Sequence, residues 1–477
     1  MITAQVFRGK RYAVLGLARS GVATVEALLA SGADVVAWDS DEAKRDALKA
    51  PLLQGRGWGG ASARNELKVD RPRPPTPSPE GAGALSFADP LEIDLTGFDG
   101  VVVSPGVPLN KHPIADHARK ARVPVIGDIE LFALARPSLP PHKVVGITGT
   151  NGKSTTTALI HHILETAGVP TLMGGNIGLP ILSQNPLPEG GVYVLELSSY
   201  QIDLTFSLDC DVAVLTNITP DHLDRYDGFD GYKASKLRLF QMQSAGNYAA
   251  ISTDDAEALK IHDQLRSSRA TEPDTVFGTQ GSYLSEPEYG PWLEGPFKQV
   301  DWPALQGPHN AQNAALALAT CSALGLTNEQ IEQGLRTYPG LPHRMERVAE
   351  KDGVLYVNDS KATNATATAP ALAAYPKIHW ILGGLPKTDD LDDCAPFFGH
   401  VLAGYTIGQA GPMFANILRE AGKPVTESGT LAQAVKDAAA AAQPGEVVML
   451  SPACASFDQF KDYEARGEAF RAAVGAL

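Results

Sequence analysis

The sequence predicts an α/β protein that is built on parallel sheets and divided into two to three domains. Apolar strands alternate with amphipathic helices along nearly the whole chain, which is the pattern of parallel sheets. The alternation starts anew at three places, and two of these starts follow breaks rich in proline and glycine. The 477 residues are also too many for a single ordinary core.

The composition limits the partners that the chain is expected to bind. A formal net charge of −14 repels nucleic acids and anionic membranes, so we expect neither as a partner. No apolar run is long enough for a signal peptide or a membrane span. The four cysteines lie far apart and show neither disulfide nor metal-site spacing: Cys210, Cys321, Cys394 and Cys454. These features favour a cytoplasmic enzyme.

The first start is the stretch KRYAVLGLARSGVATVEALLASGADVVAWDS. A short strand meets Gly16, a helix follows, and a second strand ends at Asp39, which is a βαβ unit with a dinucleotide-type turn. The turn lacks the middle glycine of Gly-x-Gly-x-x-Gly, because Ala18 stands there, and by itself it is a weak signal. A further strand, in GVVVSPGVP, ends at a Ser104-Pro-Gly106 turn. The intervening DRPRPPTPSPEGAGA is too rich in proline and glycine to pack, and we expect an exposed, mobile insertion there.

The second start, HKVVGITGTNGKSTTTALIHHILETAG, combines a strand at about 143–148 with a glycine loop and a helix. In the loop, Gly149 and Gly152 allow backbone amides to turn around a phosphate. Lys153 can reach the terminal phosphates, and the Ser154 hydroxyl is placed to bind magnesium. The loop differs from the usual P-loop because Ile147 replaces the first glycine. A plain βα turn is the alternative, but Gly-Lys-Ser between a strand and a helix favours a nucleotide site.

Polar residues end the next two predicted strands, at 192–197 and 212–218. Glu196 closes an apolar run, where a buried carboxylate is costly unless it is paired or bound to a metal. Asn217, Asp221 and His222 follow the next strand, and hard oxygen ligands such as Glu196 suit magnesium. An ordinary salt bridge is the alternative for Glu196. A loop or capping role is the more common use of a residue such as His222.

Three further polar residues fall on predicted helices. Lys236 lies on the apolar face between Tyr232 and Leu239. It either buries its stem and extends its ammonium to water, or it is a buried lysine with a lowered pKa. Asn310 and Asn313 lie near the start of the helix in GPHNAQNAALALA, where capping is the default role and nucleotide binding the alternative.

The third start follows the break at 338–344 and contains the strands VLYVND, HWILGG and EVVMLSP. Thr363, Lys387 and Ser456 all lie just past strand ends of this predicted sheet. A lysine with hydroxyls and helix amides is a plausible receptor for a carboxylate. Ser456 also fits a helix capping box with Gln459, which would be a purely structural role.

The ordered motifs GITGTNGKST, LELSSYQ, NITPDHLDRY, GPHNAQNA, GLPHR and NDSKATN resemble those of the Mur ligases. This family forms amide bonds with ATP during the synthesis of peptidoglycan precursors. GDIELF, GGNIGLP and LSPACASFDQF are similar to the branch that adds D-glutamate. The resemblance covers almost the whole chain except about 50–92. The ordered set is far more specific than any single motif.

The resemblance implies three domains: a Rossmann-like UDP-sugar-binding domain at 1–139 with the insertion at about 50–92, a P-loop-type ATP- and magnesium-binding domain at 140–341, and a Rossmann-like amino-acid-binding domain at 342–477. It implies a monomeric ligase that joins D-glutamate to UDP-N-acetylmuramoyl-L-alanine through an acyl phosphate. The alternatives are another Mur ligase, a folylpolyglutamate synthase, a dinucleotide-dependent oxidoreductase built on Gly16–Gly21, and a nucleotide-gated binding module. The diaminopimelate-type Asp-Asn-Pro-Arg motif is absent from the sequence, and the defective glycine fingerprint argues against the oxidoreductase.

The same resemblance implies the site residues. ATP would contact Gly149, Thr150, Asn151, Gly152, Lys153, Ser154, Thr155, Asn310, Asn313, Arg344 and Asp359. Two magnesium ions would be held by Ser154, Glu196, His222 and a carbamylated Lys236, and the catalytic residues would be Lys153, His222 and Lys236. The UDP-sugar would contact Arg19, Ser20, Ser40, Ser104, Gly106 and Asn176. D-Glutamate would contact Thr363, Lys387, Ser456 and Tyr463.

Three positions depart from the family pattern. Asp41 follows Ser40 where an arginine is frequent. The loop GGLPKTDD around Lys387 lacks the common Asp-Lys-Gly, and Tyr463 stands where phenylalanine is typical.

Overall fold

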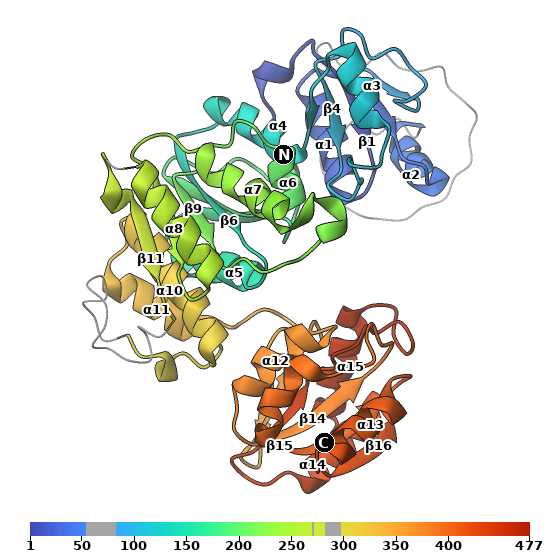
Figure 1. Cartoon of the computed structure of the whole chain (residues 1–477). Coiled ribbons are helices and arrows are strands. Elements are labelled where there is room, and N and C mark those ends of the chain that lie inside the picture. The colour runs from blue at the N-terminus through green and yellow to red at the C-terminus, as the bar shows by residue number, and fades with distance from the viewer. Residues whose placement is uncertain (54–82, 270, 282–296) are drawn as a thin grey trace, which may run out of the picture. The chain divides into compact units, whose positions relative to one another are not determined.

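A computed structural model describes residues 1–53, 83–269, 271–281 and 297–477, and these form three β-sheets with helices between the strands (Figure 1). The predicted α/β fold class is therefore confirmed. Most of the predicted insertion lies outside the described residues. The chain packs as two compact units, which comprise residues 1–157, 168–250 and 260–277, and residues 158–167, 251–259 and 278–477. The two boundaries between the three domains expected above remain a prediction.

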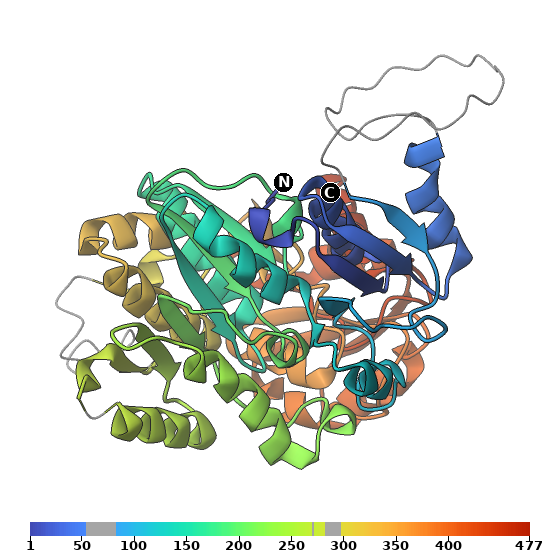
Figure 2. The same ribbon diagram turned by 90° about the horizontal axis from the view of Figure 1, so that it is seen from above.

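The first sheet has the strand order β3-β2-β1-β4-β5, and its strand pairs are parallel. Its strands are β1 (Arg11–Leu15), β2 (Asp34–Trp38), β3 (Leu85–Phe87), β4 (Gly100–Val103) and β5 (Val125–Ile126). The helices of this stretch are α1 (Arg19–Ala30), α2 (Glu42–Leu53), α3 (Ile114–Ala121) and α4 (Asp128–Ala135). Figure 2 shows β1 and β2 side by side in blue. The predicted βαβ unit is thus present, and α3 packs on one face of its sheet.

The second sheet has the order β11-β10-β9-β6-β8-β7. Its strands are β6 (His142–Thr148), β7 (Thr171–Gly175), β8 (Gly191–Glu196), β9 (Val212–Leu215), β10 (Tyr248–Ser252) and β11 (Val276–Thr279). The helices of this stretch are α5 (Lys153–Thr166), α6 (Ser199–Asp203), α7 (Gly228–Gln241), α8 (Ala256–Ser268), α10 (Pro308–Ala323) and α11 (Asn328–Thr337). The strand predicted at 212–218 ends earlier, at Leu215, because Asn217 turns to bind the loop after β6.

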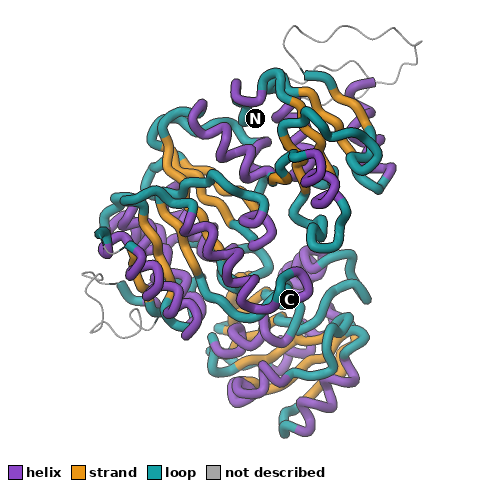
Figure 3. Tube along the Cα trace, turned by 45° about the horizontal axis from the view of Figure 1, so that its top comes forward, coloured by secondary structure: helices purple, strands orange, loops and turns teal. Residues whose placement is uncertain are grey.

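The third sheet has the order β12-β13-β17-β14-β15-β16. Its strands are β12 (Glu346–Lys351), β13 (Val354–Asn358), β14 (Ile378–Gly383), β15 (Val401–Ile407), β16 (Val425–Gly429) and β17 (Val447–Leu450). Its helices are α12 (Ala365–Ala373), α13 (Gly411–Glu420), α14 (Leu431–Ala441) and α15 (Tyr463–Gly475). The helices α12 and α13 pack on one face and α14 and α15 on the other, so the strands lie between two helical layers (Figure 3).

One edge of the third sheet carries an antiparallel strand that was not among the strands predicted from the sequence. Strand β12 pairs antiparallel with β13. The reason is local, because Asp352 and Gly353 both have positive φ, at 50° and 75°. Such a pair closes a tight two-residue hairpin, which returns the chain beside itself.

Among the described residues, no helix combines the length and the apolar character that crossing a bilayer requires.

Candidate active site

The glycine loop lies between β6 and α5 and is held in place by the end of β9. Gly149 has a φ of +144°, and a Cβ there would lie 1.9 Å from the Thr216 Oγ1. The Thr150 amide donates to the Asn217 carbonyl at 3.0 Å, and the Asn151 amide donates to the Asn217 Oδ1 at 2.8 Å. Gly149 therefore makes the turn, which explains why the loop does not need the first glycine of a P-loop.

Lys153 begins α5 and bends back over the loop. Its Nζ donates to the Gly149 carbonyl at 2.9 Å and to the Thr150 carbonyl at 2.7 Å. Ser154 and Thr155 follow in the first turn of α5. A cation and the amide-rich start of a helix thus lie together at the end of β6, which is an arrangement that attracts phosphate.

Glu196 is a buried carboxylate that lacks one partner. It ends β8, and only 2% of its surface is exposed. The Asn176 Nδ2 donates to its Oε1 at 2.9 Å, whereas its Oε2 has no hydrogen-bond partner within the described part of the chain. An unpaired carboxylate oxygen in the interior is costly, and a divalent cation would satisfy it. The residue therefore fits a metal ion better than the ordinary salt bridge.

Lys236 is buried with its charged end inside the protein. Only 2% of its surface is exposed, so its ammonium does not extend to water. Its Nζ donates to the Gly149 carbonyl at 2.8 Å and lies 4.6 Å from the centre of the Tyr232 ring. Burial lowers the pKa of Lys236 to about 7, with a further contribution from the charge of Lys153. The Nζ atoms of Lys153 and Lys236 thus both donate to the carbonyl oxygen of Gly149.

His222 is held by few contacts. It has a left-handed backbone with a φ of +52°, and 51% of its side chain is exposed. The imidazole lies 5.2 Å from the Tyr200 ring and 3.4 Å from the Asp221 carboxylate. It does not cap the short helix that follows. Across the described ranges, no group of three or more histidine, cysteine, aspartate or glutamate residues could hold a metal by itself.

Asn310 and Asn313 are buried at the start of α10, but neither caps the helix. The N-cap is Gly307, which makes no side-chain cap bond. The Asn313 Nδ2 donates to the Asn310 Oδ1 at 3.2 Å, and the Asn310 Nδ2 donates to the Gln306 carbonyl at 3.1 Å. The default prediction of capping is therefore wrong for both residues. The structure brings these two asparagines together.

Arg344 precedes β12 and Asp359 follows β13, and the charge of Arg344 acts on the Asp359 carboxyl. Asp359 accepts hydrogen bonds from the Ser451 hydroxyl at 2.8 Å and the Met345 amide at 3.1 Å. Burial raises the pKa of Asp359 to about 6, although Arg344 acts against this shift. His343 and Met345, on either side of Arg344, both have left-handed backbones with φ of 60° and 47°. Arg344 therefore lies within a turn of unusual backbone conformation.

The strand ends of the third sheet bring together part of the predicted carboxylate receptor. The Lys387 Nζ donates to the Thr363 Oγ1 at 3.1 Å. Ser456 is buried, but it begins a turn rather than a helix, because its carbonyl accepts from the Gln459 and Phe460 amides. The predicted capping box at Ser456 is wrong. Helix α15 begins later, at Tyr463, and Asp462 caps it.

Arg466 was not predicted from the sequence. It is buried on α15 and donates to the Ser360 hydroxyl at 3.0 Å, the Ser360 carbonyl at 2.8 Å and the Ala455 carbonyl at 3.2 Å. It thus joins the loops that carry Thr363 and Ser456. The available signal was an arginine on the same helix as the apolar Phe470 and Val474.

Of the residues predicted for the UDP-sugar, Ser20 and Ser104 lie at the turn after β1. A Cβ on Gly16 would lie 2.7 Å from the Ser104 Oγ, which donates to the Gly16 carbonyl at 3.0 Å. Ser20 and Ser104 line one small cavity together with Asp128. The Arg19 Nη2 donates to the Gly178 carbonyl at 3.0 Å, whereas Asn176 bonds Glu196.

Asp41 stands where the family frequently has an arginine, but Arg45 lies close to the predicted UDP-sugar residue Ser40. The Arg45 Nη1 donates to the carbonyl of Ser40 at 3.2 Å, and its guanidinium covers the Trp38 ring at 4.3 Å. Gly106 and Ser40 are exposed.

Asp128 supplies a test of the electrostatics of this turn. Its carboxyl is fully buried, and burial raises its pKa from 3.8 to about 6. Below pH 3.8 the group is protonated in both states. As the pH rises through about 6, stability is lost, because ionisation costs more in the folded than in the unfolded chain. We expect the difference in free energy of unfolding between Asp128→Asn and the wild type to grow by about 2 kcal/mol between about pH 4 and about pH 7. Urea unfolding across this pH range measures the free energies of both proteins. A difference between them that does not change with pH would contradict the raised pKa of Asp128.

The chain matches two family models and is similar to known proteins along its whole length. A family model described as "Mur ligase middle domain" matches residues 147–321, and one described as "Mur ligase, glutamate ligase domain" matches residues 343–454. The UDP-N-acetylmuramoylalanine–D-glutamate ligase of Novosphingobium aromaticivorans is 60% identical over 477 residues, which cover 100% of this chain and 97% of the relative. The protein of the same name from Sphingopyxis alaskensis is 59% identical and is covered completely, as is this chain.

Two solved structures share the fold at low identity. The first is the UDP-N-acetylmuramate-alanine ligase MurC from Thermotoga maritima, which has a TM-score of 0.54 and 17% identity, with 98% of this chain and 99% of that chain covered. The second is MurF from Acinetobacter baumannii, which has a TM-score of 0.54 and 18% identity, with 98% of this chain and 92% of that chain covered.

Proposed function

The chain belongs to the Mur ligase family, and on that premise we propose that it is the ATP-dependent ligase that joins D-glutamate to UDP-N-acetylmuramoyl-L-alanine. The observation that carries the proposal is the identity of 60% with a D-glutamate ligase along the whole chain. The reaction is a step of peptidoglycan precursor synthesis, on which cell shape and division depend.

The chemistry requires activation by ATP, because a carboxylate and an amine do not condense in water. The γ-phosphoryl group of ATP is transferred to the L-alanyl carboxylate, which gives an acyl phosphate and ADP. The amine of D-glutamate then attacks the acyl carbon and loses a proton. The tetrahedral intermediate expels phosphate and leaves the amide.

The residues around the glycine loop are suited to the first step. The amides of 149–155 and the start of α5 would bind the phosphates of ATP. Lys153 would exchange its bonds to the Gly149 and Thr150 carbonyls for bonds to the terminal phosphates, which stabilises the charge that is transferred. Asn310, Asn313, Arg344 and Asp359 would contact the rest of the nucleotide.

Mur ligases use magnesium, and the unpaired oxygen of Glu196 supports a cation there. When bound, magnesium would neutralise charge on the transferring phosphoryl group. We propose two ions, held by Ser154, Glu196, His222 and a carbamylated Lys236.

Carbamylation of Lys236 requires that its Nζ lone pair attack the carbon of carbon dioxide and release a proton. Only the neutral amine can react. The buried position of Lys236 beside Lys153 disfavours the ammonium form, which supports the modification. The product places an anion near Lys153.

We further propose that Arg19, Ser20, Ser40, Ser104, Gly106 and Asn176 contact the UDP-sugar and that Thr363, Lys387, Ser456 and Tyr463 contact D-glutamate. The bond between Lys387 and Thr363 supports the second set, since it places a cation beside a hydroxyl. The domain boundaries at 139/140 and 341/342 give each domain one of the three sheets. We expect the enzyme to act as a cytoplasmic monomer.

The proposal is tested by phosphate release with MgATP, UDP-N-acetylmuramoyl-L-alanine and one amino acid at a time. We expect release with D-glutamate to exceed that with L-lysine, diaminopimelate or L-alanine by at least about 10²-fold, because a site with buried polar groups rejects ligands that leave them unpaired. Activity with one of the other amino acids and not with D-glutamate would refute the assignment.

A further inference from the structure

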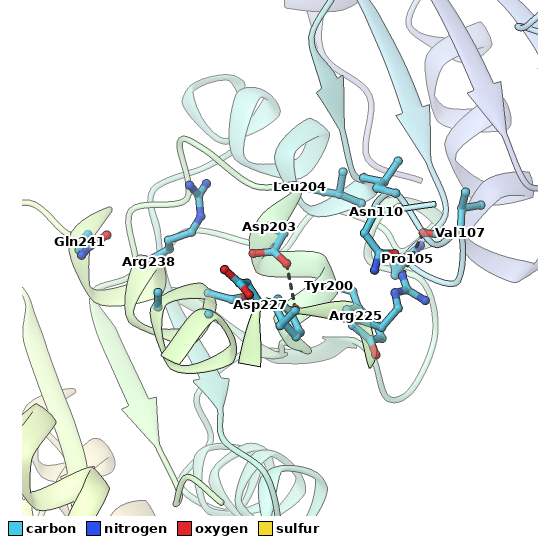
Figure 4. A pocket seen from close by; sticks show the side chains of 15 residues that line it. Pro105, Val107, Asn110, Tyr200, Asp203, Leu204, Arg225, Asp227, Arg238 and Gln241 are labelled. Carbon is cyan, nitrogen blue, oxygen red and sulfur yellow. Dashed lines mark hydrogen bonds between the residues drawn. The ribbon is translucent and has the colours of Figure 1, made fainter. Parts of the chain in front are cut away.

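A cavity of about 530 Å³ lies between the loop that follows β4 and the segments around α6 and α7. The loop Pro105–Asn110 forms one wall, and Tyr200, Arg225 and Arg238 belong to the other side (Figure 4). Arg225 stands at the end near Val107 and Asn110, whereas Arg238 stands at the opposite end beside Gln241.

Two hydrogen bonds join the loop to the segment that carries His222. The Arg225 Nη2 donates to the Val107 carbonyl at 3.0 Å, and the Asn110 Nδ2 donates to the Asp224 carbonyl at 3.2 Å. The Val107 amide in turn donates to the Ser104 carbonyl at 3.0 Å. The connection therefore begins at the turn that we propose to bind the UDP-sugar.

The same arginine supports His222 through an aromatic ring. The Arg225 guanidinium lies 4.2 Å from the centre of the Tyr200 ring, and the His222 ring lies 5.2 Å from that ring. His222 is half exposed and has a left-handed backbone, so it depends on such contacts for its position. A displacement of Arg225 would thus be felt at His222.

We propose that Arg225 is a positioning residue that couples the UDP-sugar loop at 104–110 to His222, through its bond to Val107 and its contact with Tyr200. The proposal rests on the proposed function, since that function places the UDP-sugar at Ser104 and Gly106 and gives His222 a role in the reaction.

The first test measures hydrogen exchange by mass spectrometry with and without UDP-N-acetylmuramoyl-L-alanine, in the absence of ATP, magnesium and D-glutamate. In the wild type we expect the substrate to slow exchange in both 104–110 and 218–227. Arg225→Met keeps the length of the side chain but removes the guanidinium. In this variant we expect protection to remain at 104–110 and to be lost at 218–227.

Arg238→Met is the matched control. Arg238 lines the same cavity, donates to the Thr205 carbonyl at 2.7 Å and lies 5.2 Å from the Phe206 ring. These two contacts of Arg238 involve neither the 104–110 loop nor Tyr200. We therefore expect Arg238→Met to retain protection in both segments.

The second test is kinetic. We expect Arg225→Met to lower kcat by about 3- to 30-fold while the KM for ATP stays unchanged, because the loss affects coupling and not nucleotide binding. Arg225→Lys can still donate to Val107 but lacks the planar group over Tyr200, so it should recover only part of the loss.

The outcomes separate the inference from the proposed function. Protection at 218–227 that persists in Arg225→Met, or that is absent from the wild type while 104–110 is protected, would overturn the coupling alone. A substrate that protects neither segment in the wild type would overturn the proposed function and the coupling with it.

Discussion

Replacing Lys236 with alanine is expected to lower kcat by about 10²–10³-fold, the range found when one group that stabilises charge in a transition state is removed. The lysine is buried beside the glycine loop, and its Nζ contacts the Gly149 carbonyl. In carbamylated form it supplies an anion to the metal site, and alanine supplies none. Phosphate release at saturating substrate measures the effect, and incorporation of isotope-labelled bicarbonate into the wild type alone shows the modification.

Lys233→Ala is the control for this variant. Lys233 lies on the same helix, where its Nζ is 2.7 Å from Asp230 and 4.9 Å from the Phe229 ring. Because it belongs to a surface pair, we expect kcat to change by less than about twofold. Full activity of Lys236→Ala in buffer free of bicarbonate would contradict the role of the carbamate.

Replacing Glu196 with glutamine is expected to move activity and stability in opposite directions. Activity should fall by about 10²–10³-fold, because the neutral amide is a poor ligand for magnesium. In a chelating buffer, the free energy of unfolding should rise by about 1 kcal/mol, because a buried carboxylate charge with an unpaired oxygen is replaced by a neutral amide. The lost attraction to Lys236 reduces this gain. Denaturant unfolding and phosphate release measure the two effects.

Glu130→Gln separates a functional glutamate from a structural one. Glu130 is also buried, but its carboxylate accepts hydrogen bonds from the Phe206 amide at 2.6 Å, the Ser207 amide at 2.9 Å and the Ser207 hydroxyl at 2.7 Å. We expect this variant to lose about 1–3 kcal/mol of stability and to keep its kcat. A similar loss of stability in Glu196→Gln would show that Glu196 serves the fold instead.

The features that could be predicted from the sequence are those that depend on neighbouring residues. Glu196 ends an apolar strand, so its burial follows from the strand pattern. Helix periodicity placed Lys236 on the same face as Tyr232 and Leu239, but it left open whether the ammonium group is buried. The glycine loop could be predicted because its strand, turn and helix follow one another directly in the sequence.

The features that the sequence could not supply depend on segments that are distant along the chain. Arg466 is recognised only when α15 is placed against Ser360 and Ala455. The capping role predicted for Ser456 was wrong because α15 begins seven residues later, at Tyr463. Asp128 is noticeable only because the fold buries it beside Ser20 and Ser104, which lie far away in the sequence.

The carbonyl of Gly149 accepts from both Lys153 and Lys236, and this has a consequence for the search for inhibitors. Without carbamate, an anionic compound at the loop meets the ammonium group of Lys153 and the free amine of Lys236. With carbamate, it meets one cation and one anion. The same compound would then rank differently on two preparations of the enzyme that differ only in their exposure to carbon dioxide. Screens against this site should therefore fix and report the bicarbonate concentration.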